Sequence, residues 1–251
     1  MDFVKVQGLS NDFIVIDGPY VPDPLDVVRW CERRTGVGAD GVLVIEPIDS
    51  GRMSMRYWNA DGGEAEMCGN GLRCIARLGY DREWVTSRTF VVETAVGDHE
   101  VTVHEDFVRA FVGVANPFRT ETLSIAGYRV HPFAIGNPHA VIFVDDVDEA
   151  PVDTVGPEIE HDAMFPNRTN VEFVQVMDDG SITARIWERG VGETPASGTG
   201  ATASAYVAHT FGGLTIPIVV HLRGGALIIT FDDRGAWMEG PAEIVFSGTL
   251  D

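Results

Sequence analysis

The chain has 251 residues, 45% of them hydrophobic, and carries a formal net charge of −20. This length can hold one large domain or two of about 120 residues each, and the negative charge argues against nucleic acid or an anionic membrane as a partner. The composition, with Lys5 as the single lysine, is typical either of a halophilic protein or of an ordinary acidic soluble one.

The N-terminal stretch and the cysteines indicate where the protein works. MDFVKVQGLSNDF has no basic stretch followed by an apolar segment, and no run approaches the roughly 18 apolar residues of a membrane span. The three cysteines, Cys31, Cys68 and Cys74, lack the spacing of a zinc site and cannot all pair with one another. We therefore expect a cytoplasmic protein with reduced thiols and no metal.

Alternating and β-branched segments predict strands along the whole chain. In chain order these segments are VLVIEP, FVVETAV, VEFVQV, ALIITF and AWMEG. After Cys68, apolar residues at helical spacing predict a helix that stops at Gly79. After Ser197, the small and apolar stretch GTGATASAYVAHTFGG predicts a second helix, buried against a sheet.

An internal repeat divides the chain into two halves. GEAEMCGNGLRCIA and GETPASGTGATASA align without a gap at an offset of 129 residues, which sets Cys68 opposite Ser197. A second correspondence, at an offset of 128, sets NDFIVID against HAVIFVD. Proline and polar residues around Asn116 and Pro117 predict the boundary, with residues 1–116 and a returning strand at 240–251 in the first half and residues 117–239 in the second.

The repeated segments are glycine-rich turns that lead into helices. Such a turn leaves backbone N–H groups directed outward at the positive end of the helix dipole, and so forms an anion site. Two of them facing across a cleft would hold one carboxylate, with Cys68 and Ser197 on opposite faces of the adjoining carbon. This arrangement suits removal of an α-proton on one face and its return on the other, with the helix ends stabilising the developing negative charge.

Chemistry of this kind on an amino acid commonly uses pyridoxal phosphate bound to a lysine. Lys5 lies in an N-terminal segment that reads as a strand and offers no context for such a bond. If the substrate is an amino acid, we expect a reaction without a cofactor.

Motifs along nearly the full length resemble those of the diaminopimelate epimerase family. The matching segments, in the family's order, are GLSNDFIVID, GVGADGVLVIEP, NADGGEAEMCGNGLRC, GNPHAV, FPNRTNVEF and WERGVGETPASGTGA. The resemblance implies an α+β fold of two pseudo-symmetric halves, each a curved, mostly antiparallel sheet around a central helix, with the active site in the cleft between them. It further implies a homodimer that converts LL-diaminopimelate, a small diamino-dicarboxylic acid, to the meso isomer without pyridoxal phosphate.

The resemblance also assigns roles to individual residues. Cys68 is one catalytic base and Ser197 stands where the family has its second cysteine, while Glu188 would engage the α-ammonium and His139 would line the pocket beside Asn137. The resemblance further implies that the amides of Gly69, Asn70, Gly198 and Thr199 hold the reacting carboxylate. It implies that the far end of the substrate is bound by Asn11, Asn59, Asn170 and Arg189. A second departure from the family is Ser10, where a glycine is common.

Several of these residues also have purely structural interpretations. His139 precedes an apolar strand, where a histidine commonly has its hydrogen bonds satisfied within the fold, and Cys31 and Cys74 fit packed core thiols. Two carboxylates and two arginines, repeated in both halves, fit turns and braces of the fold: Glu64, Glu193, Arg56 and Arg185.

Ser197 limits a mechanism that uses two bases. A serine hydroxyl with no adjacent base titrates about five pH units above a thiol, which costs about 7 kcal/mol, or about 100,000-fold in rate. Three hypotheses remain: a diaminopimelate epimerase slowed by a natural or introduced serine; a related isomerase, epimerase or dehydratase of another amino or hydroxy acid with Cys68 as single base; and a former enzyme that only binds an amino acid.

Overall fold

The computed structural model describes residues 1–114 and 121–250. The predicted boundary at Asn116 and Pro117 lies outside the described residues. The chain forms two compact units, the first made of Met1–Phe111 and Glu239–Asp251 and the second of Val112–Met238. None of the helices in the described ranges is long and apolar enough to cross a membrane.

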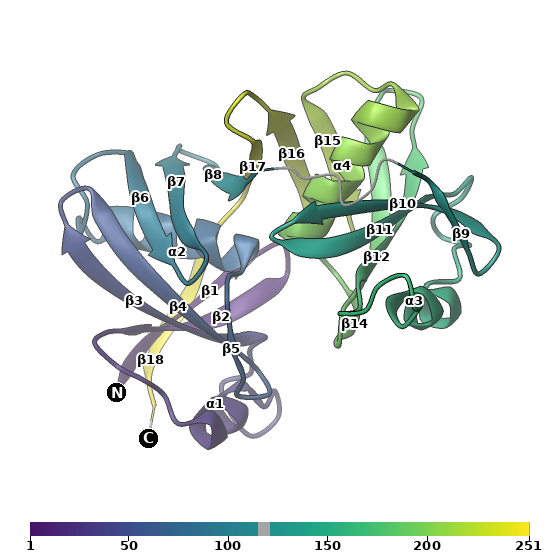
Figure 1. The fold of residues 1–251 in the computed structure, drawn as a ribbon. Helices are drawn as coiled ribbons and strands as arrows, with labels where there is room; N and C mark the ends of the chain where they lie inside the picture. The colour runs from purple at the N-terminus through teal and green to yellow at the C-terminus, as the bar shows by residue number, and fades with distance from the viewer. Residues whose placement is uncertain (115–120, 251) are drawn as a thin grey trace. The chain divides into compact units, whose positions relative to one another are not determined.

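The elements of the first unit include two helices (Figure 1). They are β1 (Asp2–Gly8), β2 (Asn11–Asp17), α1 (Pro24–Cys31), β3 (Gly41–Asp49), β4 (Arg52–Asn59), β5 (Glu64–Ala65), α2 (Gly69–Asp81), β6 (Thr89–Thr94), β7 (Gly97–Val103), β8 (Val108–Gly113) and β18 (Glu243–Thr249). β8 runs across the limit between the two units, and β18, the last strand, pairs with β1.

The second unit begins with an additional short strand, β9, and then follows the same order of elements; its last strand, β17, continues beyond Met238 into the first unit. The elements of the second unit are β9 (Leu123–Ile125), β10 (Tyr128–Ile135), β11 (Asn137–Phe143), α3 (Val152–Glu160), β12 (Asn170–Val176), β13 (Ile182–Glu188), β14 (Gly192–Thr194), α4 (Gly198–Gly212), β15 (Ile218–Leu222), β16 (Gly225–Phe231) and β17 (Ala236–Gly240). All five segments expected from the sequence form strands, except that Ala95 and Val96 at the end of FVVETAV lie in a turn.

Strand pairing repeats from one unit to the other. In the first unit β1/β2 is antiparallel, β2/β3 parallel, β3/β4 antiparallel, β4/β6 parallel and β6/β7 antiparallel. In the second unit β10/β11, β11/β12, β12/β13, β13/β15 and β15/β16 follow the same sequence of directions. The predicted fold of two pseudo-symmetric, mostly antiparallel halves is confirmed.

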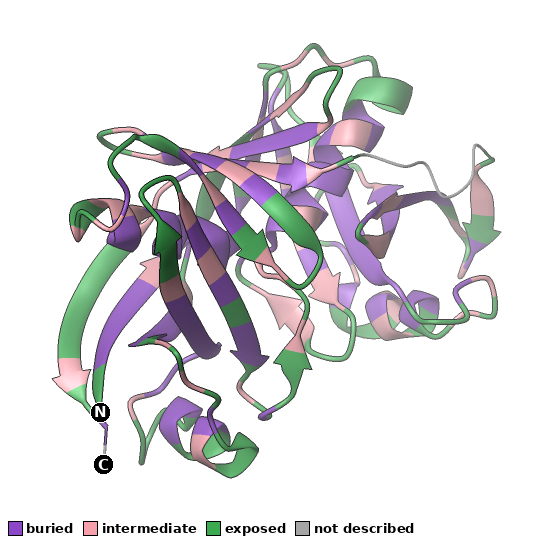
Figure 2. Ribbon diagram, turned by 60° about the vertical axis from the view of Figure 1, so that its left-hand side comes forward, coloured by how far each residue is buried: buried purple, intermediate pink, exposed green. Residues whose placement is uncertain are grey.

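A central helix organises each unit. α2 contacts β1, β2, β3, β4 and β7, and α4 contacts β10 to β13, β15 and β16, so the strands surround each helix (Figure 1). Leu72 and Ile75 of α2 are buried in a core that includes Val6 and Phe13. Figure 2 shows buried residues along many of the strands and on the helices, with exposed residues in the loops and also on parts of strands and helices. Burial of this apolar surface stabilises each unit.

Two sequence predictions need correction. α2 continues to Asp81, because Gly79 has no helix-ending role. This glycine makes room for Met53, whose Sδ would clash with a Cβ at this position. The offset of 128 is also wrong for the first strands of the repeat. β2 and β11 each begin with an asparagine, Asn11 and Asn137, and their pairing with β3 and β12 sets these residues in register at an offset of 126.

Candidate active site

Helix α2 begins directly after Cys68, in the turn that the sequence predicts as an anion site. Cys68 is the N-cap residue, with extended backbone angles of φ −135° and ψ 117°, and its thiol is half-buried. Gly69 and Asn70 follow in the first turn, where backbone N–H groups find no acceptor within the helix. Gly71 fits because a Cβ there would lie only 3.2 Å from Leu43. The thiol thus lies at the positive end of the helix dipole.

The side chain of Asn11 lies beside this turn. Its Oδ1 accepts hydrogen bonds from Asn70 Nδ2 at 3.1 Å and from Cys68 Sγ at 3.6 Å. Its Nδ2 donates to Asp40 Oδ2 at 2.7 Å. Because an amide nitrogen can only donate, Asp40 fixes the amide orientation that directs Oδ1 towards the thiol.

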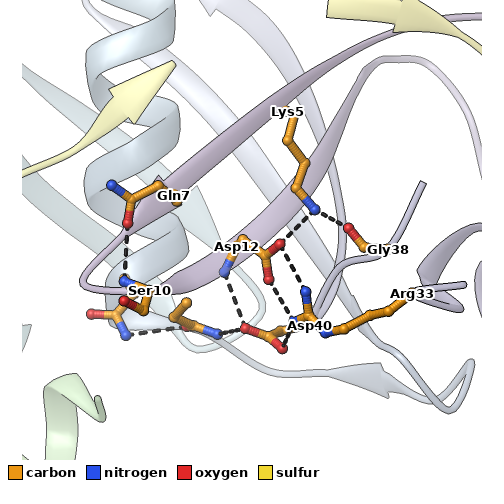
Figure 3. A network of polar contacts seen from close by, with 9 residues as sticks. Lys5, Gln7, Ser10, Asp12, Arg33, Gly38 and Asp40 are labelled. Carbon is orange, nitrogen blue, oxygen red and sulfur yellow. Dashed lines mark hydrogen bonds and ion pairs between the residues drawn. The ribbon is translucent and has the colours of Figure 1, made fainter. Parts of the chain in front are cut away.

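A network of charges holds Asp40 in place (Figure 3). Arg33 Nη2 contacts Asp40 at 2.6 Å and Asp12 at 2.8 Å, and Lys5 Nζ contacts Asp12 at 2.6 Å and donates to the carbonyl oxygen of Gly38. Burial raises the pKa of Asp12, but hydrogen bonds and charges from Arg33 and Lys5 outweigh it and keep this pKa below its usual value. The single lysine of the chain is thus part of the support beneath Asn11.

Helix α4 begins in the same way after Ser197. Ser197 is the N-cap residue with φ −134° and ψ 123°, so its backbone matches that of Cys68 within a few degrees. Its Oγ accepts a hydrogen bond from the backbone N–H of Gly200 at 3.3 Å, and the residue is only 4% exposed. Gly198 and Thr199 occupy the positions that correspond to Gly69 and Asn70. The two turns share one geometry and differ in the reactive side chain.

Glu188 lies next to Ser197 in the second unit. It is the last residue of β13, and its Oε1 accepts a hydrogen bond from Thr194 Oγ1 at 2.6 Å. Burial raises the pKa of Glu188, while hydrogen bonds with Thr194 and Ser197 act in the opposite direction. Ser197 thus has an adjacent carboxyl group, so the penalty worked out for a serine with no adjacent base does not apply in full.

His139 belongs to a chain of polar contacts that ends at Thr199. Glu172 Oε1 lies 2.6 Å from His139 Nδ1, and both side chains are fully buried. His139 Nε2 lies 2.8 Å from Asn137 Oδ1, and Asn137 Nδ2 donates to Thr199 Oγ1 at 3.4 Å. Burial raises the pKa of Glu172. His139 is satisfied within the fold, as its structural interpretation predicts, and it is also connected to the turn of α4.

The residues predicted to bind the far end of a substrate are more dispersed. Asn170 Oδ1 accepts from the backbone N–H of Arg189 at 2.9 Å, and Asn170 Nδ2 donates to the carbonyl oxygen of Pro138 at 3.0 Å, so this buried side chain ties β12 to its neighbours. Arg189 is exposed and donates through Nη1 to the carbonyl oxygen of Asn167 at 3.2 Å. Asn59 is exposed at the end of β4 in the first unit.

The other two cysteines are core residues. Cys31 and Cys74 are buried, and burial raises the pKa of each thiol to about 12. Arg73, one residue before Cys74 in α2, is fully buried, which lowers its pKa to about 10. Its positive charge interacts with both Cys74 and Cys68. Of the three thiols, Cys68 alone combines partial exposure with a helix N-terminus.

The repeated arginines and glutamates form matching braces. Arg56 contacts Glu64 at 2.9 Å across β4 and β5, and Arg185 contacts Glu193 at 2.8 Å across β13 and β14. Each pair fixes the short strand that leads to the turn of its unit. Their structural interpretation is confirmed.

Sequence reasoning missed Glu172 and Asp40, which orient predicted site residues. One signal was present for Glu172, a charged residue in the middle of the apolar strand VEFVQV. A buried carboxyl group is costly unless it is hydrogen-bonded, so a charged residue in an apolar strand predicts a buried hydrogen-bond partner.

The fold and the two turns define an α+β protein of two similar halves, with a thiol or hydroxyl at the N-cap of each central helix. The crystal structure of a PhzF-family phenazine biosynthesis protein of Bacillus anthracis has the same fold, with a TM-score of 0.75 at 15% identity over 100% of this chain and 99% of that chain. The diaminopimelate epimerase family profile matches residues 3–116 and 133–245. Relatives named diaminopimelate epimerase are 39% identical in Moorella thermoacetica and 44% identical in Pelotomaculum thermopropionicum, each over 99% of this chain and 98% of the relative. The chain belongs to the diaminopimelate epimerase family.

Proposed function

We propose that this protein epimerises LL-diaminopimelate to meso-diaminopimelate without pyridoxal phosphate. The observation that carries the proposal is the pair of helix N-termini at Cys68 and Ser197, which share backbone angles within a few degrees. Near 40% identity to proteins named diaminopimelate epimerase supports the substrate. Inversion at a carbon needs a proton removed on one face and returned on the other, and we assign one face to each turn.

The turns themselves bind the carboxylate of the reacting centre in this proposal. The backbone amides of Gly69 and Asn70 in α2, and of Gly198 and Thr199 in α4, stand at the positive ends of their helices. The same donors stabilise the negative charge that develops as the α-carbon loses its proton. Because they are held by the fold, these donors need no rearrangement during the reaction.

On the first face Cys68 takes or gives the proton. The positive charge of the buried Arg73 and the helix dipole both favour the thiolate form, which is the basic one. The protonated thiol is the form that donates to Asn11 Oδ1. Asn11 therefore holds the thiol in its acid form, and α2 with Arg73 stabilises its base form.

On the second face Ser197 acts together with Glu188. As the Ser197 oxygen takes the α-proton, its own hydrogen passes to the Glu188 carboxylate; in the opposite direction the Glu188 acid returns a proton to Ser197 while Ser197 protonates the carbanion. A raised pKa suits Glu188 to both steps. In the same proposal the Glu188 carboxylate also lies nearest to the α-ammonium of the bound substrate.

The remaining site residues are assigned to the far end of the substrate. We assign the distal amino-acid group to the four residues that the family resemblance implies, and the lining of the pocket to Asn137 and His139. The four are Asn11, Asn59, Asn170 and Arg189. The fixed amide of Asn170 supports this assignment because it holds the backbone of Arg189 in place.

We also propose that the protein is a cytoplasmic homodimer. Strand β18 exposes three consecutive apolar residues, Ile244, Val245 and Phe246, which are 46%, 53% and 47% exposed. An apolar strand of this kind is normally covered, and a second copy of the chain is the occupant we assign. Replacing Phe246 by Asp should convert the dimer to a monomer in analytical ultracentrifugation, whereas a wild-type monomer would refute the assignment.

The proposed reaction is tested by incubating each isomer with the purified enzyme and separating the products by chiral chromatography. Cys68→Ala should lower the rate between about 100- and 10,000-fold, the usual contribution of a positioned acid or base. Cys74→Ala, which removes a buried thiol in the same helix, is the matched control and should retain the wild-type rate within about threefold. Wild-type activity in Cys68→Ala, or no conversion of either isomer by the wild type, would refute the proposal.

A further inference from the structure

A pair of buried positions beneath the central helices differs in polarity between the two units. In the first unit Phe13 faces Gly41 across β2 and β3, with Leu43 two residues further along β3. In the second unit His139 faces Asn170 in the same register, with Glu172 two residues further along β12. An apolar pair in one half is thus replaced by a histidine and a carboxyl group in the other.

Both pairs make the same contact with the helix above them. A Cβ at Gly71 of α2 would meet Leu43 at 3.2 Å, and a Cβ at Gly200 of α4 would meet Glu172 Oε1 at 3.1 Å. Glu172 therefore lies directly against the first turn of α4. Within the part of the chain that the structure describes, its second oxygen, Oε2, is buried without a hydrogen-bond partner. The first unit shows that an apolar pair suffices for packing at this place, so the polar pair needs another explanation.

The direction of the hydrogen bonds explains why this pair is polar. Asn137 Nδ2 can only donate, so Thr199 Oγ1 accepts, and the oxygen Asn137 Oδ1 accepts from His139 Nε2. His139 Nε2 then carries a hydrogen, and Nδ1 shares the remaining proton with Glu172. Since Thr199 Oγ1 already accepts a bond, its own hydrogen is available to a further acceptor at the N-terminus of α4.

Loss of the proton shared by His139 and Glu172 would reverse the direction of these hydrogen bonds. Nε2 would then accept, the Asn137 amide would turn over, and the Thr199 hydrogen would be used within the network. The charged and titratable groups that face Glu172 are His139 from β11 and Glu188 from β13. Burial and the Glu188 carboxylate both oppose a net negative charge on the pair of Glu172 and His139. They therefore favour the hydrogen-bond directions that leave the Thr199 hydrogen available.

We propose that Glu172 is a positioning residue which, through His139 and Asn137, sets the Thr199 hydroxyl as a hydrogen-bond donor at the first turn of α4. The inference rests on the proposed function, in which that turn binds the carboxylate of the substrate. Glu172 does not touch the substrate. It determines the direction of the hydrogen bonds that run from His139 through Asn137 to Thr199.

Three variants separate positioning from packing. Glu172→Gln can donate its amide hydrogen to Nδ1 and preserve the network. Glu172→Leu removes it and leaves a buried histidine. The double variant Glu172→Leu with His139→Phe copies the apolar pair Leu43 and Phe13 of the first unit, and so restores packing without the network.

Kinetics and nitrogen-15 NMR of the histidine rings give the readouts. We expect Glu172→Gln to keep the wild-type KM within about threefold, and the double variant to recover the melting temperature lost in Glu172→Leu while KM stays raised about 10- to 100-fold, as for a lost bond to a charged group. Thr199→Val should raise KM equally, and adding Glu172→Leu to it should cause no further rise. In the wild type the His139 spectrum should show hydrogen on Nε2, and Glu172→Leu should change it.

Wild-type KM in the double variant, or an unchanged His139 spectrum in Glu172→Leu, would overturn the proposal. An additive effect of Glu172→Leu and Thr199→Val would do the same. The NMR result does not depend on activity, so a failure of the proposed epimerase reaction is distinguishable from a failure of this inference.

Discussion

Replacing Ser197 with cysteine should make the second turn chemically similar to the first. The backbone of Ser197 already has the angles that Cys68 adopts, so the substitution needs no change in the main chain. Its cost is the hydrogen bond from Gly200 N–H to Ser197 Oγ. Loss of such a cap costs about 1 kcal/mol, so the melting temperature should fall slightly.

The expected gain in rate is the difference between two effects, the greater acidity of a thiol and the assistance that Glu188 gives to Ser197. A thiol ionises about five pH units below a lone hydroxyl, which corresponds to about 100,000-fold in rate. In the proposed mechanism Glu188 assists Ser197, and general-base assistance is worth about 100- to 10,000-fold. The difference predicts that Ser197→Cys increases epimerisation by about 10- to 1,000-fold.

The assay is conversion of LL- to meso-diaminopimelate and the reverse, followed by chiral chromatography under identical conditions for both proteins. Ser204→Cys is the matched control, because Ser204 is buried in the same helix and its hydroxyl donates to the carbonyl oxygen of Gly200 at 2.8 Å. It should give no increase. An unchanged or lower rate in a folded Ser197→Cys protein would refute the assignment of this position to proton transfer.

Three further outcomes follow from the structure. Ser10 has a left-handed backbone with φ 64°, so Ser10→Gly should stabilise the protein by about 1 kcal/mol in urea unfolding, and a destabilised variant would contradict this. Burial raises the pKa of Glu188, so the folded protein binds a proton at pH values between the unfolded and the folded pKa, and wild-type stability falls as pH rises through that window. Glu188→Gln should therefore gain in melting temperature over the wild type from pH 4 to pH 7, while losing activity. A difference in melting temperature that stays constant with pH would argue against this. Iodoacetamide should modify Cys68 in the native protein and spare Cys31 and Cys74, as mass spectrometry of peptides would show; equal labelling of all three would disprove the assigned burial.

The internal repeat correctly predicted two similar halves, each with a glycine-rich turn before a helix. Cys68 and Ser197 align in the sequence and occupy the same position before a helix, because glycine-rich turns and helix starts depend on local residues. The offset at Asn11 and Asn137 differs from 129 because the connection after each strand differs in length: residues 18–40, 23 in all, separate β2 from β3, whereas residues 144–169, 26 in all, separate β11 from β12. An insertion of this size changes the register without leaving a composition signal.

The residues that support the site could not be predicted from local pattern. Glu172 and Asp40 act on His139 and Asn11, which lie 33 and 29 residues away in the sequence. Such pairs depend on parallel strand neighbours, and periodicity within one strand does not reveal them. Gly79 was misread for a related reason, since its role is room for Met53 on another element.

The most direct test of the central claim is exchange of the α-hydrogen in deuterated water, measured separately for the LL and meso isomers with the wild-type protein. We expect unequal rates, because in the proposed mechanism one face has the Cys68 thiol and the other a serine assisted by Glu188. The faster exchange should disappear in Cys68→Ala. Equal rates from both isomers would contradict the assignment of one face to each residue.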